Sequence, residues 1–462
     1  MKINRIIISS AAALALTGLA GCNMYGKFKM PEDSQLGQAY AEAKQAPVDS
    51  AAFGNLRWQE VFTDPVLTDL IYQALDNNKD LRNAKLNVDI AAANRLGARL
   101  AYLPSLALTP NGAGSKYFDV TDMTWTYQIP AAASWEVDIF GRLLNSKRGA
   151  EASYRQSEAY RQAVRSQIIG GVANCYYTIA MLQQQLDLSR RTAELWAENV
   201  TTMKDLKEAG RVNEAAVVQS EAQYLSILGS IKDLEDNLHK ANNSMSLLMN
   251  TMPMEWVTSE NAALTAPEIL REEIPMRELA ARPDIRAAEE TLAAAYYATA
   301  GARSAFYPSL NITANGGFTD LVGGMVMNPG KWFIQLAGQL TAPLFARGQN
   351  IARLKGAKAQ QEQAMNNFEY ALLSASAEVS NAMTLYQKST EKSTLLQQQV
   401  AKLTTSVEIT EELLKLGGTS TTYLEVLTAQ QQLLSAQMSE LSCNLTTAQA
   451  VINLYQSLGG GR

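Results

Sequence analysis

The sequence predicts a mostly helical α+β protein in which one structural unit occurs twice in tandem. Three observations lead to this fold class: an internal repeat, very long stretches without proline, and segments in which apolar and polar residues alternate. In the repeat, residues 80–112 align without a gap with residues 284–316, and 14 of the 33 aligned pairs are identical. Because a solenoid needs about three or more copies, two copies favour duplication of one large unit.

The composition excludes several classes of function. The 462 residues include 45 acidic and 40 basic ones, for a formal charge of -5, and this balance argues against a partner that is a nucleic acid. One histidine and three cysteines are too few for a Cys- or His-rich metal site, a disulfide framework or extensive histidine acid–base chemistry. We therefore expect a protein that is not an enzyme and that has no catalytic residues, metal or cofactor.

The N-terminal residues are typical of exported bacterial proteins. A basic start and an apolar run over residues 6–20 predict that residues 1–21 form a signal peptide. The sequence Leu-Ala-Gly-Cys that ends at Cys22 resembles a lipobox, which predicts a lipid on the Cys22 thiol and a lipid-anchored extension over residues 22–63. The alternative is an ordinary signal peptide with a coincidental cysteine. Asn23, which is not an aspartate, favours the outer membrane over the inner one.

Residues 104–142 and 306–346 each predict two β-strands, because apolar and polar side chains alternate over most of both segments. In the first copy the apolar positions are Trp125, Tyr127, Ile129, Ala131, Ala133, Trp135 and Val137. In the second copy they are Leu310, Ile312, Ala314, Gly316, Phe318, Trp332, Ile334, Leu336, Gly338 and Leu340. The first strand, near residues 106–117, shows the weakest alternation.

The length of these strands suggests a membrane. They are about 13 to 16 residues long, and a transmembrane strand needs about 9 to 11. A soluble two-layer sheet with one wet face would alternate in the same way, and alternation alone does not exclude it. In lipid, four strands would leave open edges, which are not tolerated. The membrane interpretation therefore requires oligomerisation, and three copies would give a transmembrane β-barrel of twelve strands.

Helices are predicted before and after each pair of strands. Residues 145–207 and 349–416 contain no proline, and at 1.5 Å per residue each would form a helix of about 95 to 100 Å. Such lengths require partner helices in antiparallel bundles. Gly210 and the pair Gly417 and Gly418 are expected to end the long helices at the tips of two hairpins. The predicted helical segments are residues 64–103, 143–250, 267–305 and 347–458, with a linker over 251–266.

Two further cysteines are expected to remain free thiols. Cys175 lies 35 residues before Gly210, and Cys443 lies 25 residues after Gly418. On straight helices these positions are about 53 and 37 Å from the tips, whereas a disulfide requires Cα atoms within about 7 Å of each other. The single histidine, His239, lies on a helix segment rich in polar residues and is expected to be exposed and uninvolved.

Several motifs follow one another in a specific order along the chain. They are WEVDIFGR over residues 135–142, RPDIRAAE over 282–289, FYPSL over 306–310 and YLEVL over 423–427. This ordered set resembles the outer-membrane factor family, the TolC-like exit ducts of tripartite pumps, and specifically its lipoprotein branch. The resemblance covers essentially the whole mature chain.

The resemblance implies a homotrimer with a barrel in the bacterial outer membrane and a periplasmic helical barrel of about 100 Å. It implies a passive conduit for drugs or other toxic small molecules. An inner-membrane transporter of the resistance-nodulation-division type would supply the energy, and a periplasmic adaptor (a membrane fusion protein) would contact the helical tips. The expected adaptor contacts are Gly210, Arg211, Gly417, Gly418 and Thr419.

The resemblance also implies a pore entrance at Glu425. Relatives place a carboxylate just inside the second tip helix, and Glu425 occupies the matching position. In a trimer it would form a ring of carboxylates that favours cations. The alternative is an ordinary solvated helix residue, and the second carboxylate that some relatives carry three residues later is Thr428 here.

The charged residues of the motif at 282–289 have two interpretations. Arg282, Pro283, Asp284 and Arg286 could form a binding site. The structural interpretation is stronger, because Pro283 suits the first turn of a helix and Asp284 favours the positive end of the helix dipole.

Two other functions compete with a small-molecule exit duct. A lipid-anchored coiled-coil scaffold without a pore would explain the lipobox and the long helices but would leave the alternating strands without a purpose. A duct for type I protein secretion would use the same architecture with a different pump.

Overall fold

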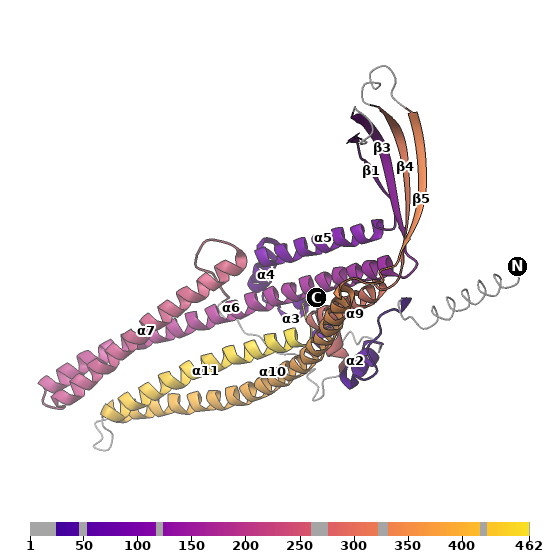
Figure 1. The fold of residues 1–462 in the computed structure, drawn as a ribbon. Helices are drawn as coiled ribbons and strands as arrows, with labels where there is room; N and C mark the ends of the chain where they lie inside the picture. Colours follow the sequence, from indigo (N-terminus) through magenta and orange to yellow (C-terminus); the bar gives the residue numbers. More distant parts are fainter. Residues whose placement is uncertain are drawn as a thin grey trace. The chain divides into compact units, whose positions relative to one another are not determined.

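The computed structural model contains two sets of helices and strands in the same order, as Figure 1 shows. It describes residues 25–45, 53–116, 123–259, 276–321, 331–415 and 423–461. The contacts within the chain divide into two compact units. Unit 1 includes residues 25–37, Leu86–Glu158 and Arg286–Tyr370, and unit 2 includes Gln38–Lys85, Ala159–Ile285 and the residues from Ala371 onward.

Unit 1 contains an antiparallel sheet in which the strands follow the order β1-β3-β4-β5, with β2 also paired to β3. The strands are β1 (Ser105–Leu108), β2 (Asn111–Ser115), β3 (Thr124–Val137), β4 (Ser309–Leu321) and β5 (Lys331–Thr341). Because β1 and β2 continue one register along β3, they occupy a single strand position. The sheet thus has the four strand positions that the sequence predicts, two from each repeat.

Two prolines explain why the first strand is interrupted. Pro110 separates β1 from β2, and Pro130 lies in β3 opposite the interruption. A proline has no backbone N–H to donate to a neighbouring strand. At this place the N–H of Thr109 donates to the carbonyl of Pro130, at 3.0 Å. The weak alternation near residues 106–117 thus coincides with a real break in the ladder.

The register of the strands sorts the alternating side chains into one apolar and one polar face. On the apolar face, Leu106 lies opposite Ala133, Ala133 opposite Ala314, and Ala314 opposite Leu336. A row on the other face is polar: Glu136 lies opposite Asn311, and Asn311 opposite Gln339. Several side chains of the apolar face are strongly exposed, among them Ile334 at 88% and Leu336 at 75%. One whole face of the sheet therefore presents apolar side chains outward.

Each repeat contains one very long helix followed by a shorter one that returns beside it (Figure 1). α6 (Arg142–Glu208) and α10 (Gln349–Lys415) both have 67 residues. The returning helices are α7 (Glu214–Met249) and α11 (Tyr423–Ser457). In unit 2, α6, α7 and α11 share an apolar cluster that includes Trp196, Ile231 and Leu427. Within the described ranges, every helix is too short or too polar to cross a bilayer.

The helical segment expected over 64–103 is two helices, which corrects the simpler expectation of one. α4 (Pro65–Asn77) and α5 (Lys79–Leu100) meet at Asn78. The side-chain oxygen of Asn78 accepts hydrogen bonds from the N–H groups of Asp80 at 2.9 Å and Leu81 at 3.1 Å. This N-cap starts a new helix, because it satisfies donors that have no partner inside the helix.

The second repeat is interrupted at the equivalent position. Of the segment expected over 267–305, the structure describes α8 (Met276–Ala281) and α9 (Pro283–Ser304), with Arg282 between them. Pro283 occupies the first position of α9, where its missing N–H does no harm. Residues 260–275, which include the second part (260–266) of the linker expected over 251–266, lie outside the described residues.

The N-terminal extension expected over 22–63 contains short helices that the sequence did not indicate. They are α2 (Gln35–Gln45), the 3₁₀-helix η2 (Phe53–Asn55) and α3 (Trp58–Val61). In unit 2, the rings of Phe53 and Phe62 pack edge-on against Tyr455 of α11. The Tyr455 hydroxyl donates a hydrogen bond to the carbonyl of Leu56 at 2.7 Å. These contacts join the extension to the end of the last helix.

Candidate functional site

The first hairpin tip is a tightly capped turn between α6 and α7. Gly210 adopts a left-handed conformation, with φ of 71°. Its N–H donates to the carbonyl of Lys207, and the N–H of Arg211 donates to the carbonyl of Leu206, each at 2.9 Å. This pair of bonds is a Schellman motif, which ends a helix by satisfying its last carbonyls. Gly210 is thus the helix stop that the sequence predicts, and Arg211 lies exposed beside it.

The next helix begins three residues later with its own cap. The side chain of Asn213 accepts a hydrogen bond from the N–H of Ala216 at 3.1 Å. Two ion pairs cross the hairpin: Lys207 contacts Glu214, and Lys204 contacts Glu221 at 2.8 Å. Because these side chains are exposed, we expect each pair to contribute less than about 1 kcal/mol. The tip is held mainly by its backbone caps and presents charged side chains outward.

The second tip is only partly described. Gly417, Gly418 and Thr419 lie outside the described residues, as does Cys22, the predicted lipid attachment site. Glu425 lies in the first turn of α11, and its side chain is exposed. A carboxylate there is favoured by the positive end of the helix dipole. The structure therefore places Glu425 on an accessible surface and not in the protein core.

The residues on either side of Glu425 anchor the start of α11. Leu427 is buried in the apolar cluster with Trp196 of α6, and Tyr423 packs against the same cluster. Burial, together with the negative charge of Glu411 on α10, raises the pKa of Tyr423 to about 12. The Tyr423 hydroxyl thus stays neutral at physiological pH. These buried neighbours hold the start of α11 in place, and the side chain of Glu425 lies exposed at its surface.

A hydrogen-bonded relay that the sequence analysis missed joins three helices near this point. Asn199 of α6 donates to the side-chain oxygen of Gln430 on α11 at 3.0 Å. The Gln430 side-chain nitrogen in turn donates to Glu411 of α10 at 2.8 Å. The sequence offered one signal, since the pair Ala429-Gln430 repeats Ala222-Gln223. The repeat marked the position but did not identify its partners.

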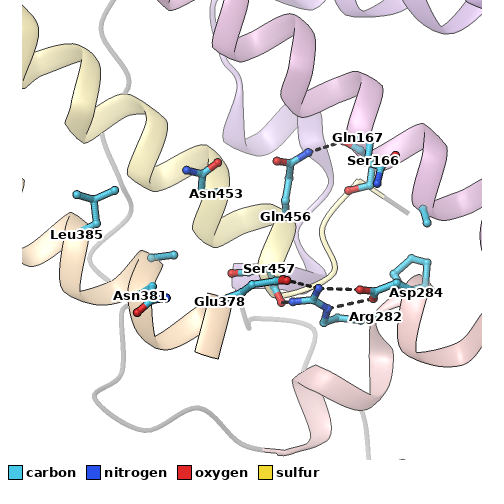
Figure 2. Close-up of a pocket in the computed structure, with 13 residues that line it drawn as sticks. Ser166, Gln167, Arg282, Asp284, Glu378, Asn381, Leu385, Asn453, Gln456 and Ser457 are labelled. Carbon is cyan, nitrogen blue, oxygen red and sulfur yellow. Dashed lines mark hydrogen bonds and ion pairs between the residues drawn. The ribbon is translucent and has the colours of Figure 1, made fainter. Parts of the chain in front are cut away.

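The first three residues of the 282–289 motif, Arg282, Pro283 and Asp284, line a groove of about 510 Å³ in unit 2 (Figure 2). The side chain of Arg282 is only 8% exposed. Its guanidinium contacts both carboxylate oxygens of Asp284, at 3.0 and 2.7 Å, and Glu378 of α10 at 2.7 Å. It also donates to the carbonyl of Ser457, at the end of α11, at 2.8 Å. One buried arginine thereby joins the start of α9, the middle of α10 and the end of α11.

These contacts support the structural interpretation of the motif. Burial raises the pKa of Asp284, but the hydrogen bonds and charge of Arg282 outweigh that effect, so the pKa lies below its ordinary value. The Arg282 donors point at protein acceptors and not into the groove. Arg286 is exposed and does not join this group.

The remaining polar candidates show no sign of catalytic chemistry. His239 is exposed and contacts Asn243 at 3.2 Å. Cys175 and Cys443 carry free thiols, and the Cys443 thiol is buried against the carbonyl of Ser389 at 3.4 Å. Among the residues that the structure describes, no three His, Cys, Asp or Glu side chains are grouped to hold a metal ion.

Comparison with known proteins agrees with this architecture. The family model "Outer membrane efflux protein" matches residues 70–251 and 274–460. The chain is 29% identical to the probable outer membrane lipoprotein SilC of Salmonella typhimurium over 454 residues, covering 96% of each protein. It is 28% identical over 468 residues to the cation efflux system protein CusC of Escherichia coli K12, covering 98% of this chain and 99% of CusC.

It is also 28% identical over 478 residues to the toluene efflux pump outer membrane protein TtgC of Pseudomonas putida, covering 98% and 96% of the two chains. A solved structure of CusC superposes with a TM-score of 0.83 at 26% identity and covers 94% of this chain and 99% of that one.

These similarities confirm two expectations from the sequence. The family model matches once in each repeat, and the mostly helical TolC-like fold is that of the solved relative. Proteins of this family are outer-membrane channels of tripartite efflux systems and not enzymes. Because the two matched segments make up far more than half of the sequence, the chain belongs to the outer membrane efflux protein family.

Proposed function

We propose that this protein is a homotrimeric, passive exit duct for toxic small molecules. It would receive them from an inner-membrane transporter of the resistance-nodulation-division type and a periplasmic adaptor. The observation that carries the proposal is the sheet of unit 1, which combines one continuous apolar face with two unpaired edges, at β1/β2 and at β5. Trp332, Ile334 and Leu336 of the edge strand β5 are among its most exposed apolar residues.

The unpaired edges support the trimer. Within a bilayer every backbone N–H and C=O must find a partner, and only a closed barrel achieves this with strands. Four strand positions per chain are too few, since the smallest membrane barrels have about eight strands. Three chains, with β5 of each paired to β1 and β2 of the next, would close a barrel of twelve strands. The polar row of Glu136, Asn311 and Gln339 would then face the lumen.

The two hairpins of unit 2 are the proposed contacts for the adaptor. Gly210 and Arg211 would contribute at the first tip, and Gly417, Gly418 and Thr419 at the second. The capped turn at Gly210 supports this role, because it is a defined exposed surface that a partner helix could recognise. Cys22 is the proposed site of lipid attachment to the outer membrane, as in the relative named a lipoprotein.

The names of two relatives point to different classes of exported compound. CusC is named for cation efflux, and TtgC is named for toluene efflux. The polar, chemically unspecific row that would face the lumen suits a conduit whose selectivity lies in the pump. We therefore propose small molecules in general as the cargo and not a folded protein, which a type I secretion duct would export.

Glu425 is the proposed selectivity element at the pore entrance. The side chain is exposed at the start of α11, between buried residues that hold the helix turn in place. Three copies of Glu425 around one axis would create a ring of negative charge that attracts cations. Divalent cations bound at this ring would block the pore.

The test uses the full-length lipidated protein extracted in mild detergent. Native mass spectrometry should show a trimer, and planar-bilayer recordings should show cation-selective conductance that divalent cations block. Glu425→Gln should weaken the selectivity and the block severalfold, because it removes three charges from the entrance. The matched control is Glu362→Gln on α10, which removes an exposed charge elsewhere. A stable monomer would overturn the duct, and an unchanged block in Glu425→Gln would overturn only the ring.

A further inference from the structure

The two repeats of the chain meet within unit 1, at a contact that we call the internal boundary. On one side lie β3 and the start of α6, from the first repeat, and on the other lie α9 and β4, from the second. The Phe140 ring stacks on the Tyr307 ring at 5.0 Å between centroids, and the Ser304 hydroxyl donates to the carbonyl of Phe140 at 2.9 Å. The internal boundary therefore shows how one repeat fits against the next.

Each half of the internal boundary occurs a second time in unit 1. β1 and α5 correspond to β4 and α9 at a shift of 204 residues, and β5 and α10 correspond to β3 and α6 at a shift of 205. β1 and β5 are the two edges of the sheet. Leu103, which corresponds to Tyr307, is 62% exposed, and Phe345, which corresponds to Phe140, is 86% exposed. Two surfaces that fit each other inside the chain are therefore repeated at opposite edges of the sheet.

The outer face of α5 is more apolar than its counterpart on α9. The residues of α9 that contact α6 are spaced so that they share one face of the helix: Glu290, Tyr297 and Ser304. The corresponding residues of α5 are exposed and apolar: Leu86, Ala93 and Leu100. Because covering apolar side chains removes them from water, this row favours a partner that packs on it. The face that makes polar contacts inside the chain is thus replaced on α5 by an apolar one.

We propose that a second copy of this chain covers these surfaces in the geometry of the internal boundary. β5 and α10 of one chain would pack against β1 and α5 of the next. Head-to-tail contacts of this kind close into a ring, in which the boundaries within and between chains have nearly the same geometry. This inference rests on the proposed trimer and adds the register of the strands and the side chains that meet between chains.

The internal boundary determines the strand register of this interface. Within the chain, Trp135 of β3 lies opposite Ile312 of β4. The corresponding pair between two chains is Leu340 of β5 and Leu108 of β1. Both side chains belong to the apolar face of the sheet and are exposed, at 64% and 67%. By the same correspondence, Phe345 would pack against Leu103 of the next chain.

The experiment tests the register with cysteine pairs in the full-length protein. After mild oxidation, Leu340→Cys combined with Leu108→Cys should give covalent dimers and trimers on a denaturing gel without reductant. Within one chain the two positions lie on opposite edge strands, about 14 Å apart at about 4.8 Å per strand, and a disulfide needs Cα atoms within about 7 Å. The matched control combines Leu340→Cys with Leu106→Cys, on the same face but about 7 Å further along β1, and should give about tenfold less product.

A second pair tests the boundary next to the strands. Phe345→Cys combined with Leu103→Cys should be joined between chains by a short bifunctional maleimide, whereas either single variant should stay monomeric on the gel. The inference is overturned if the two Leu340 pairs react equally, or if neither the Leu340 and Leu108 pair nor the Phe345 and Leu103 pair joins chains. Native mass spectrometry of the untreated variants separates the two proposals. A trimer that fails both tests retains the duct but not this interface, and a monomer overturns the duct itself.

Discussion

The two repeats interrupt the helix before their strands at equivalent positions but hold the interruption with different chemistry. Asn78 and Arg282 are separated by the same 204 residues as the aligned repeats. The amide nitrogen of Asn78 donates to the carbonyl of Leu248 near the end of α7, at 2.9 Å. The guanidinium of Arg282 donates to the carbonyl of Ser457 at the end of α11, at 2.8 Å. In both repeats, a side chain at the interruption binds the end of the returning helix.

The returning helices also end alike. Asn250 after α7 and Gly459 after α11 both have left-handed backbones, with φ of 55° and 80°. The difference lies in charge, because a neutral amide needs few partners whereas a buried guanidinium must be neutralised. Asp284 and Glu378 do this in the second repeat. The two repeats thus share the backbone geometry at the interruption and differ in the group of side chains around it.

Replacing Arg282 should have the largest effect on this arrangement. Arg282→Leu leaves two carboxylates without their cation and one carbonyl without its donor. We expect the free energy of unfolding to fall by about 3 kcal/mol, the low end for breaking a buried pair, since both carboxylates remain half-exposed to water. The denaturant midpoint of helical circular dichroism of the trimer in detergent measures this. Arg286→Leu, at an exposed position, should change it by less than about 0.5 kcal/mol.

Gly459 should be the next most sensitive position. Its backbone is left-handed, and an added Cβ would lie 3.1 Å from the Cα of Arg282. Gly459→Ala therefore has two costs: the left-handed backbone is unfavourable for alanine, and the new Cβ crowds Arg282. We expect the free energy of unfolding to fall by about 2 kcal/mol in the same assay. Gly210→Ala is the control, because Gly210 is also left-handed but its Cβ would meet nothing within 4 Å. An equal loss at both sites would contradict the steric contribution of Arg282.

The first repeat should tolerate the equivalent change better. Asn78→Ala removes the cap on α5 and the bond to Leu248, for an expected loss of about 1.5 kcal/mol. Asn78→Ser keeps a capping hydroxyl but is too short to reach the carbonyl, so its loss should be intermediate. If Asn78→Ala proved as damaging as Arg282→Leu, the argument from buried charge would be wrong.

The smallest expected difference between the repeats is in how the stability contributions of Arg282 and Asn78 depend on pH. The folded-state pKa of Asp284 is lowered, so its contribution to stability is present above the ordinary aspartate pKa of 3.8 and is lost as the pH falls below it. The stability gap between wild type and Arg282→Leu should therefore narrow on acidification below about pH 4. The gap between wild type and Asn78→Ala should stay flat, since an amide does not titrate. If acid titrations showed that the stability differences of both variants from wild type narrow equally, the proposed contribution of Asp284 would be wrong.

The same two interruptions show how far sequence reasoning reaches. Pro283 predicted a helix start, because its fixed φ and its missing N–H donor are local properties of the residue. Asn78 did not predict the interruption in the first repeat, since asparagine is only mildly unfavourable within a helix. The partners of Arg282, at sequence separations of 96 and 175 residues, had no local signal at all.

The candidate site likewise contains one feature that the sequence predicts and others that it does not. Gly210 was predictable as a helix stop, because a left-handed residue followed by a returning helix favours glycine. The relay from Asn199 through Gln430 to Glu411 was not predictable, since it depends on how three helices are aligned along their axes. The contacts of Arg148 with the backbone carbonyls of Tyr25 and Gly26 were equally unpredictable, because the donor and its acceptors are 123 and 122 residues apart.

Local periodicity and backbone restrictions were sufficient to determine the duplicated order of elements, the long helices and the two-faced strands, because each depends on residues close together in the chain. Tertiary structure alone decided which distant groups meet: the charge cluster around Arg282, the relay at Gln430 and the contacts of Arg148 with Tyr25 and Gly26. These contacts join distant segments, and a hydrogen bond about 3 Å long depends on the relative placement of whole helices, which no local pattern encodes.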